Sequence, residues 1–115
     1  MSIQKREDDF THNPRLTDCM TIMDHYVLLK QDERGLYYAK YCVGLGADMT
    51  GLGWLVHLKM ALSYSRIGDS QESCNQVRKA LELDTQRRIC ETNVIERLEL
   101  QHVFYDICAA AKYCK

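Results

Sequence analysis

The chain has 115 residues, of which 46% are hydrophobic and 27% charged, the balance of an ordinary globular protein with one domain. Fifteen Lys and Arg against 16 Asp and Glu leave a formal net charge of -1, with both signs scattered along the sequence. A nucleic-acid-binding domain usually shows a basic excess or a basic cluster. Because adjacent basic residues occur only as separate pairs, at Lys5-Arg6, Arg78-Lys79 and Arg87-Arg88, we expect no binding to DNA or RNA.

The N-terminal residues 1–12 are charged and carry no regular apolar pattern, so we predict a flexible arm there. They contain no apolar core of signal-peptide length. No window approaches the roughly 18 apolar residues that a membrane-spanning helix needs. We therefore expect a cytoplasmic chain that enters no membrane, with residues 13–115 forming a single helical domain.

Six cysteines stand at positions 19, 42, 74, 90, 108 and 114. An even number can indicate a disulfide framework in a small secreted protein. Here the spacings are irregular, no secretion signal is visible, and most of the cysteines occupy apolar positions of helical patterns. We therefore expect reduced, buried thiols, with Cys114 exposed and open to oxidation. No zinc-type spacing of Cys or His occurs, and neither a metal nor a cofactor is expected.

Apolar residues recur every three or four positions and no long stretch alternates with period two, so the predicted fold class is all-α. Asn13-Pro14 predicts a helix start, because Asn can cap free amides and Pro fits the first helical position. This first helix is expected over about residues 14–30. A polar turn at residues 31–34 then precedes a second helix that ends at about residue 43.

Residues 44–54 carry four glycines and invite comparison with a phosphate-binding loop. Such a loop follows a buried strand, and the P-loop also ends in Lys followed by Ser or Thr. Neither condition is met, so we expect a connector between helices. Gly44 or Gly46 can end the preceding helix in the left-handed conformation, and Thr50 can cap the following one.

Two more amphipathic helices are predicted over about residues 52–66 and 69–83, with Asp69 or Ser70 as the cap between them. Their close-approach points carry small side chains, at Ala61, Ser73 and Ala80. Two helices in such tight contact cannot bury both apolar faces alone. Neighbouring elements are therefore expected on either side.

The last helical region is expected over about residues 86–113. Its second half has one apolar stripe that begins at Leu100, and the apolar residues Val94 and Ile95 of its first half do not continue that stripe. Either this helix is long and contacts different neighbours along its length, or it breaks near residues 99–101.

The segment from Trp54 to Arg87 resembles the tetratricopeptide repeat, a helix–turn–helix unit of about 34 residues. His57 replaces the usual Trp of that unit, and Thr85 stands where Pro is common. A weaker copy can be laid over residues 16–49, so the resemblance implies about two repeats and a packing helix after them. The positions that fit the unit best are Tyr64, Gly68, Ala61, Ser73 and Ala80.

In that family the first helices of successive pairs line a concave groove that contacts a partner segment. The mostly aliphatic residues at the matching positions imply an amphipathic helix or an extended peptide as the partner. The alternative is that several of them pack against the C-terminal helix. The candidate partner-binding residues are Met20, Asp24, Val27, Leu28, Leu55, Leu58, Lys59, Leu62 and Arg66.

The resemblance thus implies a protein-interaction scaffold, similar in size and charge to the cytoplasmic chaperones of bacterial type III secretion. A regulatory module that pairs with a transcription or signalling protein is the alternative. The family's carboxylate clamp is not expected, because Met20 and Asp24 occupy the places of its Lys and Asn. Short repeat arrays expose apolar ends, which favours a permanent partner or a homodimer.

An enzyme would have to draw on His25, His57 or His102 together with Cys90 or Asp24. None of these residues forms a nucleophile, base and orienting acid at a recognisable spacing. We therefore expect no catalytic activity.

Overall fold

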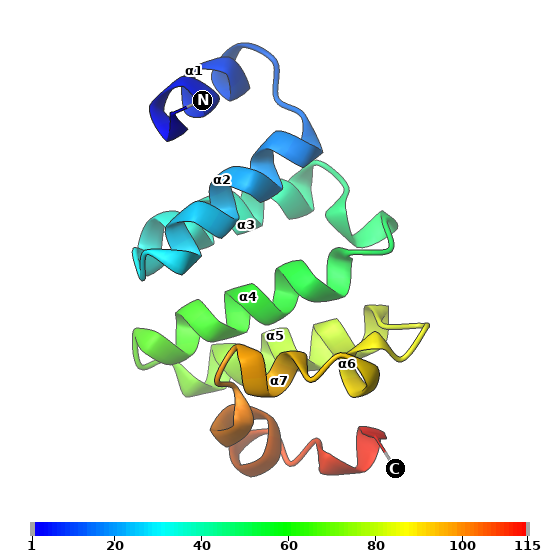
Figure 1. Ribbon diagram of the computed structural model, residues 1–115. Coiled ribbons are helices and arrows are strands. Elements are labelled where there is room, and N and C mark those ends of the chain that lie inside the picture. The colour runs from blue at the N-terminus through cyan, green and yellow to red at the C-terminus, as the bar shows by residue number, and fades with distance from the viewer. Residues whose placement is uncertain (1, 115) are drawn as a thin grey trace.

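A computed structural model describes residues 2–114, and within this range it contains helices and no strand, which confirms the all-α class (Figure 1). The longer helices are α1 (Ile3–His12), α2 (Leu16–Leu28), α3 (Asp32–Gly44), α4 (Gly53–Arg66) and α5 (Ser70–Leu83). The shorter ones are η1 (Ala47–Met49), α6 (Arg88–Glu91), α7 (Val94–Arg97), η2 (His102–Ile107) and η3 (Ala111–Cys114).

The helices are stacked in layers along the longest dimension of the molecule, which measures 44 × 28 × 20 Å. Helix α2 packs along α3, helix α4 packs along α5, and α3 joins the two pairs by contacting α4 (Figure 1). Helix α1 lies against the α2–α3 pair at one end. The chain after α5 covers the other end, so neither end of the stack is an open apolar face.

Small residues allow the close contact between α4 and α5. Ala61, Ser73 and Ala80 are fully buried, and the Ser73 hydroxyl donates a 2.7 Å hydrogen bond to the carbonyl oxygen of Ala61. At the turn between the helices Gly68 has φ +88°, and the Asp69 carboxylate accepts from the Glu72 amide at 3.1 Å. The prediction of a tight hairpin capped at Asp69 is therefore confirmed.

Helix α2 begins at Leu16, two residues later than predicted, and the Asn13 side chain does not cap it. Instead Asn13 ends α1, where its backbone N–H donates to the Asp9 carbonyl at 2.9 Å. The predicted polar turn at residues 31–34 is also wrong, because α3 begins at Asp32. Acidic side chains in a first helical turn stabilise the positive end of the helix dipole, which explains why this polar stretch is helical.

The connector between the two pairs agrees in part with expectation. Gly46 has φ +99°, so it is the residue that adopts the left-handed conformation after α3. Thr50 does not cap α4 directly. Its hydroxyl accepts from the amide of Leu52 at 3.1 Å and donates to the carbonyl of Ala47 at 2.7 Å, which closes the turn before α4.

Residues 3–12 form a helix, so the predicted flexible arm is wrong for this stretch. Phe10 is buried, and its ring meets the edge of Tyr38 at 6.0 Å between centroids. Carboxylate Oε1 of Glu7 accepts hydrogen bonds from the hydroxyls of Tyr26 at 2.6 Å and of Tyr38 at 3.0 Å. Phe10 and Glu7 thus hold α1 against the α2–α3 pair. Two contact residues are too few to show as a helical period in the sequence.

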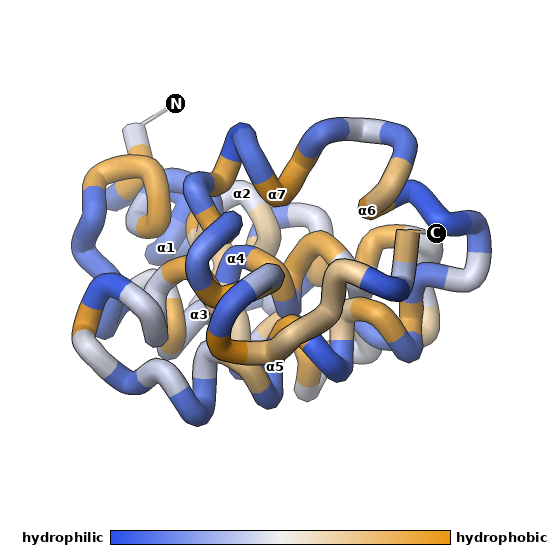
Figure 2. Tube along the Cα trace, turned by 90° about the horizontal axis from the view of Figure 1, so that it is seen from below, coloured by the Kyte–Doolittle hydropathy of each residue, from blue (hydrophilic) through white to orange (hydrophobic). Residues whose placement is uncertain are grey.

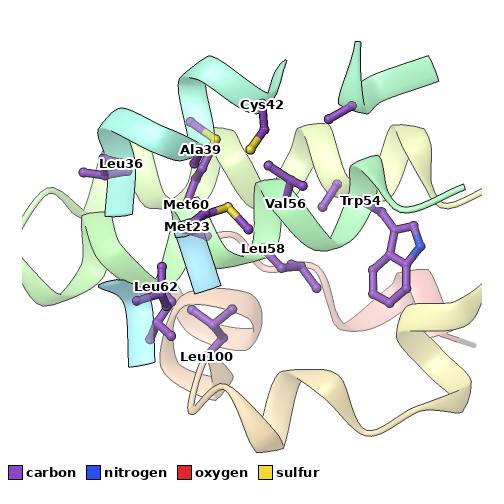
Figure 3. Packing of buried hydrophobic residues seen from close by; sticks show 14 of the residues in the cluster. Met23, Leu36, Ala39, Cys42, Trp54, Val56, Leu58, Met60, Leu62 and Leu100 are labelled. Carbon is purple, nitrogen blue, oxygen red and sulfur yellow. The ribbon is translucent and has the colours of Figure 1, made fainter. Parts of the chain in front are cut away.

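The hydrophobic core runs through both helix pairs (Figure 3). Met23 and Leu36 of the first pair lie on the same side of the core as Met60 of α4, whereas Leu62 of α4 lies near Leu100 of the C-terminal part. Helices α2 and α3 therefore both bury apolar side chains against α4. The C-terminal part completes the core from the other side of α4.

The residues after α5 are neither one long helix nor two. The expected break near residues 99–101 is confirmed at Glu99, which has a left-handed backbone, but further breaks lie at Asn93 and Ala109. Asp84 starts this segment by accepting from the amides of Arg88 and Ile89 at 2.8 and 2.9 Å. Seen from below, the stretch after α7 crosses the near side of α5 with apolar residues (Figure 2).

All six cysteines form disulfides, so the expectation of reduced thiols, with Cys114 free, is wrong. The Cα atoms of the three pairs are 5.3–5.7 Å apart, within the normal range for such a bridge. The partners are 23–34 residues apart in the sequence and meet only because the helices stack. The pairs are Cys19–Cys42, Cys74–Cys108 and Cys90–Cys114.

Candidate functional site

A pocket of about 470 Å³ opens between α2, α4 and the end of α7, and we call it the α2–α4 groove. Six of the nine residues proposed from the sequence line it: Asp24, Val27, Leu28, Lys59, Leu62 and Arg66. Four further residues complete the lining: Lys30, Arg97, Leu98 and Glu99.

Helical spacing explains why the six residues meet. Asp24, Val27 and Leu28 lie within one turn of α2, and Lys59, Leu62 and Arg66 recur at three and four residues on α4. Each set therefore occupies one side of its helix. Because α2 and α4 are the first helices of their two pairs, both sides open onto the same space.

Three of the proposed residues, Met20, Leu55 and Leu58, do not line the groove. Leu58 is fully buried in the core (Figure 3). Met20 and Leu55 are half-buried against the core and do not line the pocket. On α4, the C-terminal segment supplies Leu100 to the same core and takes up part of the face that a partner was expected to contact.

The C-terminal segment thus covers part of α4, which agrees with the alternative expectation that it packs against candidate residues. It also supplies one wall of the α2–α4 groove. Arg97, Leu98 and Glu99 contribute that wall at the break after α7. Sequence reasoning missed them because their position depends on the left-handed backbone of Glu99, which the sequence pattern does not predict. Lys30 also has a left-handed backbone, directly after α2.

The floor of the groove is aliphatic and its rim carries one exposed apolar side chain. Val27 and Leu62 are buried, whereas Leu28 is 80% exposed at the opening. Leu28 is therefore the most exposed apolar side chain of the groove lining.

Charges surround this floor unevenly, with four basic and two acidic side chains in the lining. Lys59 forms an ion pair with Asp24, and Arg66 donates to Asp32 at 3.1 Å and to the carbonyl of Val27 at 2.8 Å. Within residues 2–114, no carboxylate lies within 4.0 Å of Lys30 or Arg97. Among the same residues no cation lies within 4.0 Å of the Glu99 carboxylate, so the groove presents two unpaired cations and one unpaired carboxylate beside an apolar floor.

Two of the three histidines considered for catalysis, and Cys90, are held in other contacts. His57 is 6% exposed, with Nε2 2.7 Å from Asp48 Oδ1 and Nδ1 2.6 Å from Gln76 Oε1. Both ring nitrogens are thereby occupied, and the contact joins η1, α4 and α5. Cys90 is bonded to Cys114 and carries no thiolate. His102 contacts Asp106 on the surface at 3.1 Å.

Within residues 2–114, no group of three or more His, Cys, Asp or Glu side chains is placed to hold a metal ion. None of the helices in this range combines the length and the apolar character needed to cross a bilayer.

Comparisons of the chain with protein-family models, with curated proteins and with solved structures find no match.

Proposed function

We propose that this chain is a protein-interaction scaffold that binds an amphipathic helix or an extended peptide in the α2–α4 groove. The observation that carries the proposal is the meeting of Leu28, Leu62 and Val27 with the unpaired cations Lys30 and Arg97 around one opening. An apolar floor with a few polar groups at its edge is the usual form of a peptide-binding groove.

A tetratricopeptide-like arrangement is part of this proposal. Two consecutive antiparallel helix pairs, α2–α3 and α4–α5, support it, as does the small-residue contact between Ala61 and Ser73. The first helices of both pairs line the groove, as the resemblance implies.

The charges of the groove define the chemistry of the partner segment. Asp24 is paired with Lys59, so its charge opposes an anionic ligand less than that of a free carboxylate would. Lys30 and Arg97 then favour Asp or Glu on the partner, next to the aliphatic residue that covers Leu28. Full burial of one such aliphatic anchor contributes about 1.5–3 kcal/mol.

We also propose an oxidising compartment as the working place of this protein, instead of the cytoplasm expected from the sequence. Disulfides persist in secreted and other oxidising environments, and cytosolic thiols are kept reduced. Three disulfides in 115 residues therefore disfavour both a cytoplasmic secretion chaperone and a partner of a transcription factor. The same groove is compatible with an interaction scaffold that works outside the reducing cytosol.

Selection of displayed peptides on the oxidised chain tests the groove. We expect enrichment of sequences that combine aliphatic and acidic residues, followed by measurement of their affinity by calorimetry. Leu28→Glu should weaken the selected peptide at least about tenfold, because it removes the apolar contact and adds a repelling charge. Leu29→Glu is the matched control, since Leu29 is an exposed neighbour outside the groove lining.

The proposal fails if no peptide is enriched, or if the selected peptides bind Leu28→Glu and the unchanged chain equally well. Enrichment of basic peptides would overturn the assignment of the partner's charge. Circular dichroism of both variants confirms that the helices are retained, as expected for substitutions at exposed positions.

A further inference from the structure

A second apolar surface lies on α3 and the C-terminal end of α4, and it shares no residue with the α2–α4 groove. It is a shallow hollow of about 590 Å³, which we call the tyrosine face. Tyr37, Tyr41 and Ile67 are 60%, 40% and 50% exposed there. The residues of the tyrosine face are Glu33, Leu36, Tyr37, Lys40, Tyr41, Tyr64 and Ile67.

The exposed residues of α3 in this face form one stripe. Glu33, Tyr37 and Lys40 follow one another at four and three residues, so they lie along the same side of the helix. Tyrosine at the centre of such a stripe is typical of protein interfaces, because it offers a large contact area and loses little conformational freedom on binding. Tyr64 and Ile67 of α4 form the other side of the hollow.

The charges in this stripe are unpaired and opposite. Within residues 2–114, no oppositely charged side chain lies within 4.0 Å of Glu33 or of Lys40. The Lys40 ammonium instead lies 5.7 Å from the centroid of the Tyr64 ring. The face therefore carries a carboxylate one turn before Tyr37 and an ammonium one turn after it. Such a pattern is complementary to itself when turned by 180°.

We propose that the tyrosine face binds the same face of a second copy of this chain, with the two α3 helices antiparallel. A two-fold axis near Tyr37 then brings Glu33 of each copy opposite Lys40 of the other, as an isologous interface requires. Tyr37 of each copy enters the hollow beside Tyr64 and Ile67 of its partner. The dimer leaves both α2–α4 grooves open, because the two surfaces have no residue in common.

This surface differs from the one that the sequence suggested for association. Apolar ends of the stack were expected to drive it, but α1 covers one end and residues 88–114 cover the other. The tyrosine face remains on the side of the stack. Because only seven residues form it, the dimer should be reversible and should dissociate on dilution, unlike larger permanent interfaces.

Sedimentation equilibrium of the oxidised chain over a range of concentrations is the test. We expect Glu33→Lys and Lys40→Glu each to weaken the homodimer at least about tenfold, because each puts like charges opposite one another. An equimolar mixture of these two variants should associate again with nearly the original strength. In the mixture, every position 33 faces an opposite charge at position 40, which only the antiparallel two-fold arrangement predicts.

Exposed charge changes of the same size elsewhere, Glu91→Lys and Lys112→Glu, are the controls and should leave dimerisation unchanged. The proposal is overturned if the unchanged chain is monomeric up to about 1 mM. It is equally overturned if neither single variant weakens the dimer, or if the mixture associates no better than its components. Peptide binding in the groove is unaffected by any of these results, so the two proposals are tested separately.

Discussion

The Ser73 hydroxyl donates its hydrogen bond to the carbonyl oxygen of Ala61 across the interface between α5 and α4. The contact is fully buried, and it is possible only because neither helix carries a large side chain there. It fixes how α4 lies against α5 and thereby which side of α4 faces the groove. Lys59, Leu62 and Arg66 on that side depend on it for their direction.

Replacement of Ser73 tests this contact. Ser73→Ala should lower the free energy of unfolding by about 1 kcal/mol, the usual net value of one hydrogen bond. Ser73→Leu should cost more, about 1–3 kcal/mol or above, because the larger side chain pushes the helices apart. Urea denaturation measures both, with the exposed Gln71→Ala on the same helix as the control. Equal stability of Ser73→Leu and the unchanged chain would contradict a tight interface.

Two helical glycines should respond in opposite directions to the same substitution. A Cβ on Gly53 would lie 2.8 Å from the carbonyl oxygen of Ala47 and 2.8 Å from the Cα of Asp48, so Gly53→Ala should destabilise the fold by about 1–3 kcal/mol. A Cβ on Gly44 meets nothing within 4 Å. Gly44→Ala should therefore stabilise α3 by about 0.5–1 kcal/mol through its higher helix propensity.

Thermal denaturation of the two glycine variants side by side gives the comparison. A destabilised Gly44→Ala, or a Gly53→Ala with an unchanged melting temperature, would show that η1 does not lie against the start of α4 as described.

Docking of α1 should be lost at alkaline pH. Burial first, and then the hydrogen bond to Glu7, raise the pKa of Tyr38 to about 12. The hydrogen bond to Glu7 is the main cause of the raised pKa of Tyr26. Because the folded state favours the neutral phenols, their contribution is fully present below the ordinary pKa of about 10 and is lost as the pH rises through the higher folded values.

Absorbance of ionised tyrosine against pH, together with hydrogen exchange of α1, follows this transition. Glu7→Gln should lower both tyrosine pKa values, since it removes the carboxylate that opposes ionisation. It should also speed exchange of the amides of residues 3–12. Tyrosines that all titrate near pH 10 in the unchanged chain would show that Glu7 does not hold α1 in place.

The three disulfides should be reduced in a defined order. Cys19 and Cys42 are fully buried between α2 and α3, so their bond should resist a mild reductant longest. Cys114 is exposed and Cys90 half-buried, so theirs should open first. Thiol labelling followed by mass spectrometry gives the order, and simultaneous loss of all three would contradict it.

Double replacement of Cys90 and Cys114 by Ser should cost about 2–4 kcal/mol of stability, the usual contribution of one bridge. The same change at Cys19 and Cys42 is the comparison. It should cost more, because it also removes fully buried packing between α2 and α3.

The α4–α5 hairpin was predictable to within one residue at each boundary. Its apolar periodicity is regular, Gly68 and Asp69 mark the turn, and small residues mark the contact. Such local signals act within one or two turns of the chain, so they can be read without knowing the rest of the fold. The six proposed residues that line the groove lie on α2 and α4, where the same local signals apply.

What could not be predicted depends on contacts between distant parts. The cysteine partners come together through the stacking of the helices, and Phe10 docks α1 without any periodic neighbour. The breaks at Asn93, Glu99 and Ala109 place ordinary residues in a left-handed backbone that usually selects glycine. Because Arg97 and Leu98 follow one break and precede the next, their place in the groove could not be inferred.

The bridges Cys74–Cys108 and Cys90–Cys114 both span α7, in which Glu96 and Arg97 are exposed. A protease that cuts the backbone there would leave the two fragments covalently joined at two points. The wall of the groove would then persist after cleavage, because both fragments stay attached to the rest of the fold.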